Sequence, residues 1–171
     1  MSDLASRYYS RLLGAWSGPF TFELTDRSAL QTSNAPRFTV EGMALLARVT
    51  GSSVLSTTLR QGDEEGRVFR HTTRLSKWGV TAFESQEEIS IEPDGRSLRL
   101  VGEMGFGGSR SPYESLGEIA QDAEGATYRI PWLGVTMIQA TRIHDDAREL
   151  ELTQTTDFSF GRVRLVRQAT Y

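Results

Sequence analysis

One of the two histidines in this chain stands in a pattern that would place it inside a closed sheet. His71 alternates with Phe69, Thr73 and Leu75, so these four side chains share one face of an expected strand. An imidazole that projects into an apolar cavity can serve as a general base or as an axial ligand of haem. A hydrogen-bonded histidine of the core or the surface would explain the same pattern without any function, and both interpretations stay open.

Carboxylates gather on the next expected strand, where Glu84 and Glu88 share one face and Glu87 lies on the other. A carboxyl group that enters an apolar cavity acquires a raised pKa and can transfer protons. We take Glu84 as the candidate, and a charged outer strand face is the alternative. Tyr128 is the third candidate for a hydrogen-bonding or proton-transfer role, beside His71 and Glu84.

Large aromatic residues lie near expected strand ends or in loops. The open end of a barrel is where loops and strand ends meet, so such residues could form the mouth of a pocket, and packing over the barrel rim is the alternative. The expected ligand contacts are Phe69, Trp78, Tyr113 and Trp132.

Several kinds of chemistry are excluded by composition. Without cysteine the chain has no disulfide and no thiolate ligand, and two distant histidines cannot supply a zinc site, so we expect neither a metal nor a cofactor. The glycine-rich stretch 105–109 lacks the lysine of a phosphate-binding loop and is expected to be a mobile loop or lid. The net charge of -3 comes from interspersed acidic and basic residues, so no nucleic-acid surface is expected.

The elements that would position these residues are mostly strands. A short amphipathic helix opens the chain, with Asp3 as its cap, Leu4, Tyr8 and Leu12 on one face, and Gly14 as its stop. Glu92-Pro-Asp-Gly-Arg96 is a hairpin signal, and 111–120 fits a helix or a strand. The strand-like segments are 20–25, 38–50, 54–60, 68–75, 80–92, 97–104, 135–143, 149–155 and 158–168.

Eight to ten strands with turn signals at intervals of about ten residues are typical of a sandwich or barrel. We therefore expect an all-β fold, a single antiparallel up-and-down barrel, with residues 1–171 as one domain. No apolar run is long enough to span a bilayer and no signal peptide is recognisable, which predicts a cytoplasmic protein without a membrane partner. Monomer and homodimer both remain possible.

The opening of the chain resembles that of the lipocalins and their calycin relatives. A Leu-x-Gly-x-Trp-x-Gly pattern follows the helix, formed by Leu12, Gly14, Trp16 and Gly18. The resemblance implies that the tryptophan closes one end of the barrel and that a basic residue of the last strand lies across its indole. The candidates for that residue are Arg162, Arg164 and Arg167.

Three functions are compatible with such a barrel. The first is binding of a hydrophobic or amphipathic small molecule in the cavity. The alternative is a lipocalin-like cyclase, isomerase or hydratase acting on a natural-product or lipid-like substrate, which would hold it in a reactive conformation beside one or two acid or base groups. The third is haem binding through His71, although the C-terminal region contains no histidine of the kind that nitrobindin-like barrels use.

Overall fold

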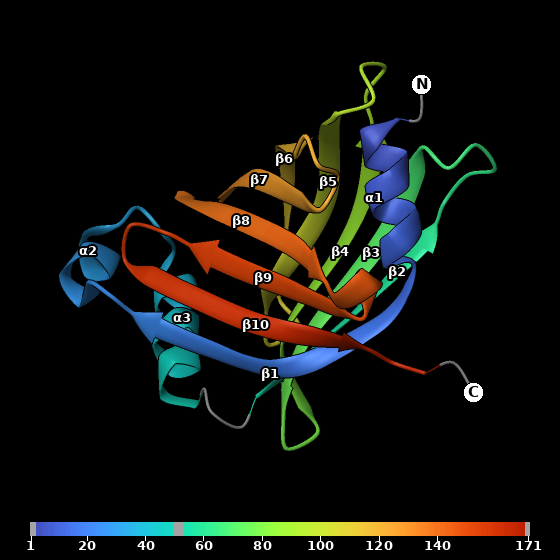
Figure 1. Ribbon diagram of the computed structural model, residues 1–171. Helices are drawn as coiled ribbons and strands as arrows, with labels where there is room; N and C mark the ends of the chain where they lie inside the picture. The colour runs from blue at the N-terminus through green and yellow to red at the C-terminus, as the bar shows by residue number, and fades with distance from the viewer. Residues whose placement is uncertain (1–2, 50–52, 170–171) are drawn as a thin grey trace.

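The protein is a closed barrel of ten antiparallel strands with helices at its two ends (Figure 1). A computed structural model describes residues 3–49 and 53–169. Its elements, in chain order, are α1 (Leu4–Leu12), β1 (Gly14–Leu24), α2 (Arg27–Thr32), α3 (Arg37–Val49), β2 (Val54–Gln61), β3 (Val68–Lys77), β4 (Val80–Ile91), β5 (Ser97–Phe106), β6 (Ser111–Ile119), β7 (Gly125–Trp132), β8 (Val135–His144), the 3₁₀ turn η1 (Asp145–Ala147), β9 (Glu149–Thr155) and β10 (Ser159–Arg167).

The strands form an up-and-down meander in which each pairs with its neighbours in the chain. The exception is β1, which pairs with β2 on one side and with β10 on the other and so closes the barrel. Closure pairs every strand on both sides along at least part of its length and leaves an interior that side chains of alternate residues line. The sequence-based expectation of a single antiparallel up-and-down barrel with a short N-terminal helix is confirmed.

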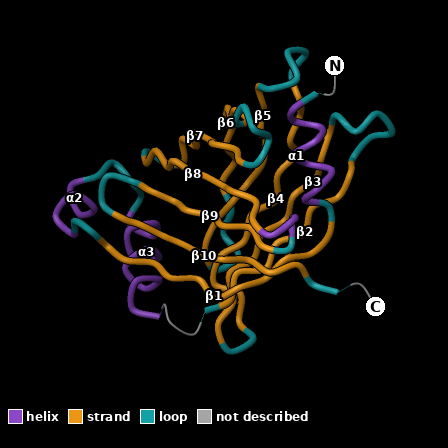
Figure 2. The backbone as a smooth tube through the Cα atoms, viewed as in Figure 1, coloured by secondary structure: helices purple, strands orange, loops and turns teal. Residues whose placement is uncertain are grey.

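Residues 38–49 of the predicted strand 38–50 are helical, so the prediction of a strand there was wrong. Its buried side chains are Thr39, Met43 and Leu46, which recur at helical spacing, and Gly42 lies against the ring of Phe106. With α2, the helix α3 covers one end of the barrel, as Figure 2 shows. Thr50 lies outside the described residues. Segment 111–120, which fitted a helix or a strand, is strand β6.

Residues 105–112 do not form the long mobile loop expected from their glycines. Strand β5 continues to Phe106 and β6 begins at Ser111, so the connection is a turn of four residues. Within it Ser109 N–H donates to the Phe106 carbonyl, and Arg110 pairs with both Glu84 and Glu103. The glycines permit a tight turn, because Gly107 and Gly108 both have positive φ.

The other end of the barrel is closed by α1 and by the indole of Trp16. The Asp3 carboxylate caps the helix by accepting from the backbone N–H groups of Ala5 and Ser6, as predicted. Trp16 is buried, and the guanidinium of Arg167 lies 4.3 Å from the centre of its ring. Of the three arginines that the lipocalin resemblance offered, Arg167 is therefore the one that covers the tryptophan.

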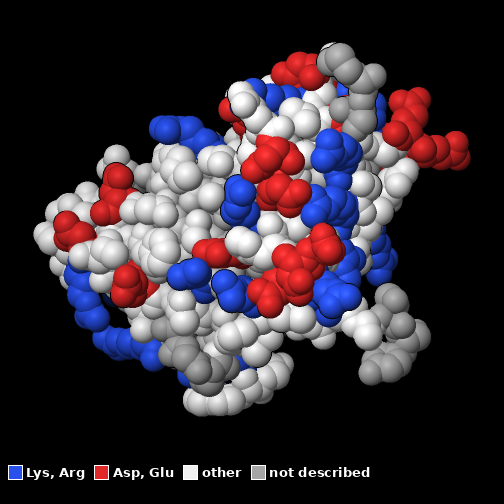
Figure 3. All heavy atoms as spheres, in the orientation of Figure 1, with Lys and Arg blue, Asp and Glu red and all other residues white. Residues whose placement is uncertain are grey.

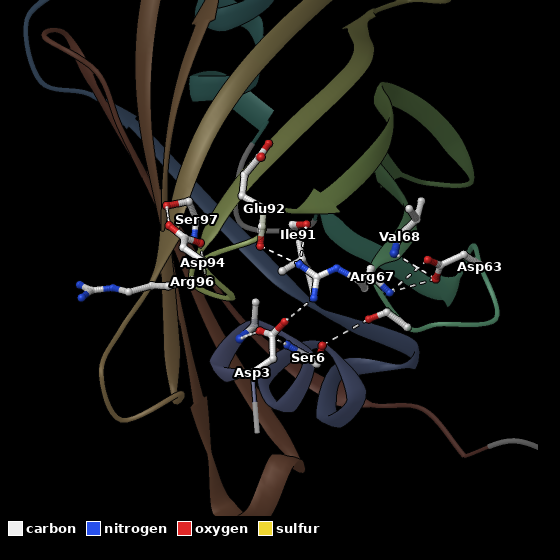
Figure 4. A network of polar contacts seen from close by, with 12 residues as sticks. Asp3, Ser6, Asp63, Arg67, Val68, Ile91, Glu92, Asp94, Arg96 and Ser97 are labelled. Carbon is white, nitrogen blue, oxygen red and sulfur yellow. Dashed lines mark hydrogen bonds and ion pairs between the residues drawn. The ribbon is translucent and has the colours of Figure 1, made fainter. Parts of the chain in front are cut away.

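Arg67 attaches α1 to the turns of the barrel wall (Figure 4). Its guanidinium pairs with Asp3 at 2.9 Å and donates to the carbonyls of Ile91 and Glu92. The backbone of Arg67 in turn donates to the carboxylate of Asp63. One arginine thus connects the helix cap to two hairpins, which fixes α1 across the closed end of the barrel.

The outer surface carries acidic and basic side chains in alternation, as Figure 3 shows for one face. Many of them are paired across neighbouring strands, for example Arg99 with Glu114 at 2.7 Å and Arg162 with Glu151 at 2.9 Å. Within the described part of the chain, no helix is long and apolar enough to cross a bilayer.

Candidate functional site

The interior of the barrel contains a hollow that lies toward α3 and opens to solvent. Met43 and Leu46 of α3 contribute to one end of it, so the helix forms part of its cover. Its apolar lining residues are Phe20, Phe22, Met43, Leu46, Leu55, Leu75, Phe83, Met104, Phe106, Trp132, Val135, Met137 and Leu152.

A second, smaller hollow lies toward α1 and is lined by residues such as Tyr8, Leu12 and Trp16. Four residues line both spaces, namely His71, Glu87, Gln139 and Leu152. Three of these four are polar. A polar layer therefore separates the apolar chamber beneath α3 from the smaller chamber beneath α1.

The centre of this layer is a chain of three side chains from three adjacent strands. Glu87 of β4 stands directly opposite His71 of β3, and its Oε2 lies 3.1 Å from the imidazole Nδ1. The Nε2 of the same ring is hydrogen-bonded to the hydroxyl of Thr57 on β2. Thr73 donates to Thr57 as well, at 3.3 Å. Carboxylate, imidazole and hydroxyl thus form one connected path across the barrel wall.

Glu87 is ionised although it is buried. Burial by itself raises the pKa of a carboxyl, but the hydrogen bond and charge of His71 and the nearby hydroxyls of Tyr113 and Ser85 outweigh it, so the pKa of Glu87 lies below its ordinary value of 4.5. Glu87 is the one Asp, Glu, Lys or Arg among the buried residues that the structure describes. A buried carboxylate requires such partners, because its desolvation is costly without them.

Gly102 allows Tyr113 to approach this carboxylate. In the strand register Glu87 is opposite Gly102, which is opposite Tyr113, so a position without a side chain separates the two. The Tyr113 hydroxyl lies close enough to lower the pKa of Glu87, yet it makes no hydrogen bond of ordinary length and angle. The carboxylate and burial together raise the pKa of the Tyr113 phenol, which therefore stays protonated.

The Glu87 carboxylate fixes the orientation of the His71 ring. A carboxylate that accepts from Nδ1 holds an imidazole in one orientation and tautomer, as in hydrolase triads. Both ring nitrogens of His71 are already hydrogen-bonded, so an axial bond to haem iron would require loss of the Thr57 contact. Among the described residues no three His, Asp or Glu side chains are grouped as metal ligands.

Glu84 does not enter the cavity, contrary to the prediction. It lies on the outer face of β4, where it pairs with Arg74 and Arg110 at 3.1 Å each. The hydrogen bond from Arg74 lowers the pKa of Glu84, so it is a carboxylate of the charged surface. The inward carboxylate of this strand is Glu87, which has the opposite parity.

Tyr128 is inside the barrel but toward the closed end. It lies within strand β7 rather than near a strand end, and its hydroxyl is hydrogen-bonded to that of Tyr9. Burial raises the pKa of both phenols well above their ordinary value. Tyr128 lines only the smaller chamber, away from the apolar space under α3.

The four residues expected to contact a ligand lie in different parts of the molecule. Trp132 lines the main chamber, where its ring lies 6.0 Å from that of Phe106, and its buried Nε1 has no hydrogen-bond partner. Phe69 is stacked on Tyr9 in the core and lines neither chamber. Trp78 is 84% exposed in the turn after β3. Tyr113 faces Glu87, as described above.

Glu87 and Thr57 are the central residues that the sequence interpretation did not select. A signal for each was present, because Glu87 alternates in phase with Phe83 and Ile89, and Thr57 lies between Leu55 and Leu59. In each strand the apolar residues identify the inward face. The polar residue on that face is then a candidate for the cavity.

We expect the stability of the protein to fall in acid partly through Glu87. Because its pKa is lower in the folded than in the unfolded chain, its stabilising contribution is present above about pH 4.5 and is lost as the pH falls through the folded value. Urea unfolding of the parent and of Glu87→Gln between pH 3 and pH 7 measures this. The difference in free energy of unfolding between the parent and Glu87→Gln should become smaller as the pH falls. A difference that stays constant would contradict the lowered pKa of Glu87.

No protein-family model matches this chain, and no curated protein matches its sequence. Among solved structures the barrel is similar to secretory abundant heat soluble protein 4 from Ramazzottius varieornatus, with a TM-score of 0.53 and 14% identity over 92% of this chain and 94% of that chain. It is also similar to a mutant of the fluorescent protein UnaG, with a TM-score of 0.51 and 16% identity over 95% and 99% of the two chains. At such identities these similarities show the fold alone, a closed up-and-down barrel of antiparallel strands.

Proposed function

We propose that this protein binds an apolar small molecule inside its barrel. The observation that carries the proposal is the chamber under α3, which apolar side chains line and a layer of polar side chains bounds. Burying apolar ligand surface there contributes about 25 cal/mol per Å². The polar groups at one boundary orient the ligand, as in other small-molecule pockets.

Native mass spectrometry of freshly purified protein, compared with the same sample under denaturing conditions, tests this proposal. We expect a bound mass that dissociates on denaturation, or uptake of one from an apolar metabolite extract. Thr73→Phe should abolish binding because Thr73 lines the chamber, whereas Thr72→Phe on the outer face of the same strand should not. Binding that persists in Thr73→Phe, or no binding by the parent, would contradict a ligand in this chamber.

A second candidate is a cyclase or isomerase that transfers protons on the bound molecule. The specific observation in its favour is the path from Glu87 through His71 to Thr57, of which Glu87 and His71 line the chamber. Incubating the complex in D₂O and measuring the mass of the released molecule by mass spectrometry distinguishes such an enzyme from a carrier. Deuterium incorporated at carbon by the parent but not by His71→Gln would indicate proton transfer, and an unchanged mass would indicate a carrier.

A further inference from the structure

The interior of the barrel has an unusual charge for a protein that binds apolar molecules. Neither Lys nor Arg is among the described residues that line the two chambers, whereas the ionised carboxylate of Glu87 lines both. The basic side chains that the structure describes at Arg74, Arg99 and Arg162 are paired on the outer wall. An anionic head group would find no lysine or arginine among these lining residues, and the His71 imidazole is already paired with the Glu87 carboxylate.

Glu87 also retains unused capacity to accept hydrogen bonds. Its Oε2 accepts from His71 at 3.1 Å, Oε1 has only a distant contact from Ser85 at 3.5 Å, and the Tyr113 hydroxyl lies nearby. An ionised carboxylate offers about four lone-pair positions, so at least one remains even when all three neighbours are counted. A donor on a bound molecule would occupy one of them and offset part of the cost of burying the charge.

The position of this acceptor sets the orientation of a ligand. Glu87 lies in the polar layer, while the space on the α3 side of it is lined mainly by aromatic, Met and Leu side chains such as Phe83 and Met104. The other polar residues that line it, Gln154, Thr156 and Ser159, are uncharged. An amphipathic molecule satisfies both surroundings when its polar group lies at the layer and its apolar part extends toward α3.

We propose that the chamber selects apolar molecules whose polar group donates a hydrogen bond and carries no negative charge, with the Glu87 carboxylate as the acceptor. This inference rests on the proposed function, because it specifies which apolar molecule the barrel binds. Alcohols and protonated amines share the required chemistry, and a fatty acid anion lacks it. Like charges a few ångströms apart in a partly buried site disfavour binding by about tenfold or more.

The test is isothermal titration calorimetry with three probes of equal chain length, dodecanol, dodecylamine and dodecanoate, at neutral pH and below their aggregation concentrations. We expect the alcohol and the amine to bind the parent protein at least about tenfold more tightly than the carboxylate. In Glu87→Gln the carboxylate should gain and the amine should lose affinity, and the alcohol should change least, because the amide oxygen of glutamine still accepts a hydrogen bond.

Glu84→Gln is the matched control, since it makes the same substitution on the outer face of the same strand. It should leave the order of the three affinities unchanged. Dodecanoate binding to the parent as tightly as dodecanol would overturn the proposed selectivity while leaving the barrel a binding protein. Binding of none of the three probes, together with no bound mass in the native spectrum, would instead reject the proposed function itself. The order of the three affinities for the parent protein tests the proposed selectivity even if Glu87→Gln fails to fold.

Discussion

Replacing Trp16 by alanine is expected to lower the free energy of unfolding by about 3–5 kcal/mol. The side chain is 2% exposed, and its Nε1 donates to the Leu12 carbonyl at 2.9 Å. Removing the indole leaves a cavity at the closed end and withdraws the ring on which Arg167 rests. Arg167 also donates to the carbonyls of Leu13 and Ala147, so the substitution loosens the contact between α1 and the last strand.

Urea unfolding at equilibrium measures this effect, and Trp78→Ala serves as the control. Trp78 is a tryptophan of the same protein with 84% of its surface exposed, so its replacement should change the free energy of unfolding by less than about 0.5 kcal/mol. Similar losses in the free energy of unfolding for Trp16→Ala and Trp78→Ala would mean that Trp16 does not stabilise the closed end.

Removing Glu87 alone is expected to destabilise the protein more than removing the whole pair that it forms with His71. Glu87→Ala leaves the imidazole without its carboxylate partner and should cost about 3 kcal/mol. A double variant, His71→Leu with Glu87→Leu, replaces the pair by apolar groups that suit the surrounding chamber. Its stability should lie within about 1 kcal/mol of the parent, because the desolvation cost of the charge disappears together with its favourable contacts.

This comparison distinguishes a structural from a functional role of the pair. The measurements are urea unfolding of the single and double variants and binding of the ligand identified by mass spectrometry. A stable double variant that no longer discriminates between polar groups of a ligand would assign the pair to recognition. A double variant as unstable as Glu87→Ala would assign His71 and Glu87 to the scaffold.

The sequence predicted the inward face of some strands correctly and that of others wrongly. On β3 the inward residues are Phe69, His71, Thr73 and Leu75, as the alternation predicted. On β4 the carboxylates occur on both faces, and choosing Glu84 placed the acid on the wrong side of the wall. Phe83, Ile89 and Ile91 of that strand share the parity of Glu87, so the phase of these large apolar residues, rather than the clustering of acids, was the informative signal.

Segment 38–50 shows where local sequence was insufficient. Its Val, Leu and Ala residues suit a buried strand as well as a helix, and short apolar stretches of this kind are ambiguous by periodicity. The contacts that decide the matter are distant in sequence, because Gly42 packs on Phe106 and Met43 lies over the chamber. The helix is stabilised by the open end of the barrel that it covers, and a strand there would leave that end uncovered.

The sequence by itself determined the architecture and its closed end. Alternating apolar residues specify strands with one buried face, turn residues separate them, and the Trp16 motif with a basic last strand specifies how one end is sealed. Only the tertiary structure decided the chemistry of the interior. The pairing of β3 with β4 places His71 against Glu87, and Gly102 leaves space for Tyr113, because register and barrel closure bring together residues that no local pattern connects.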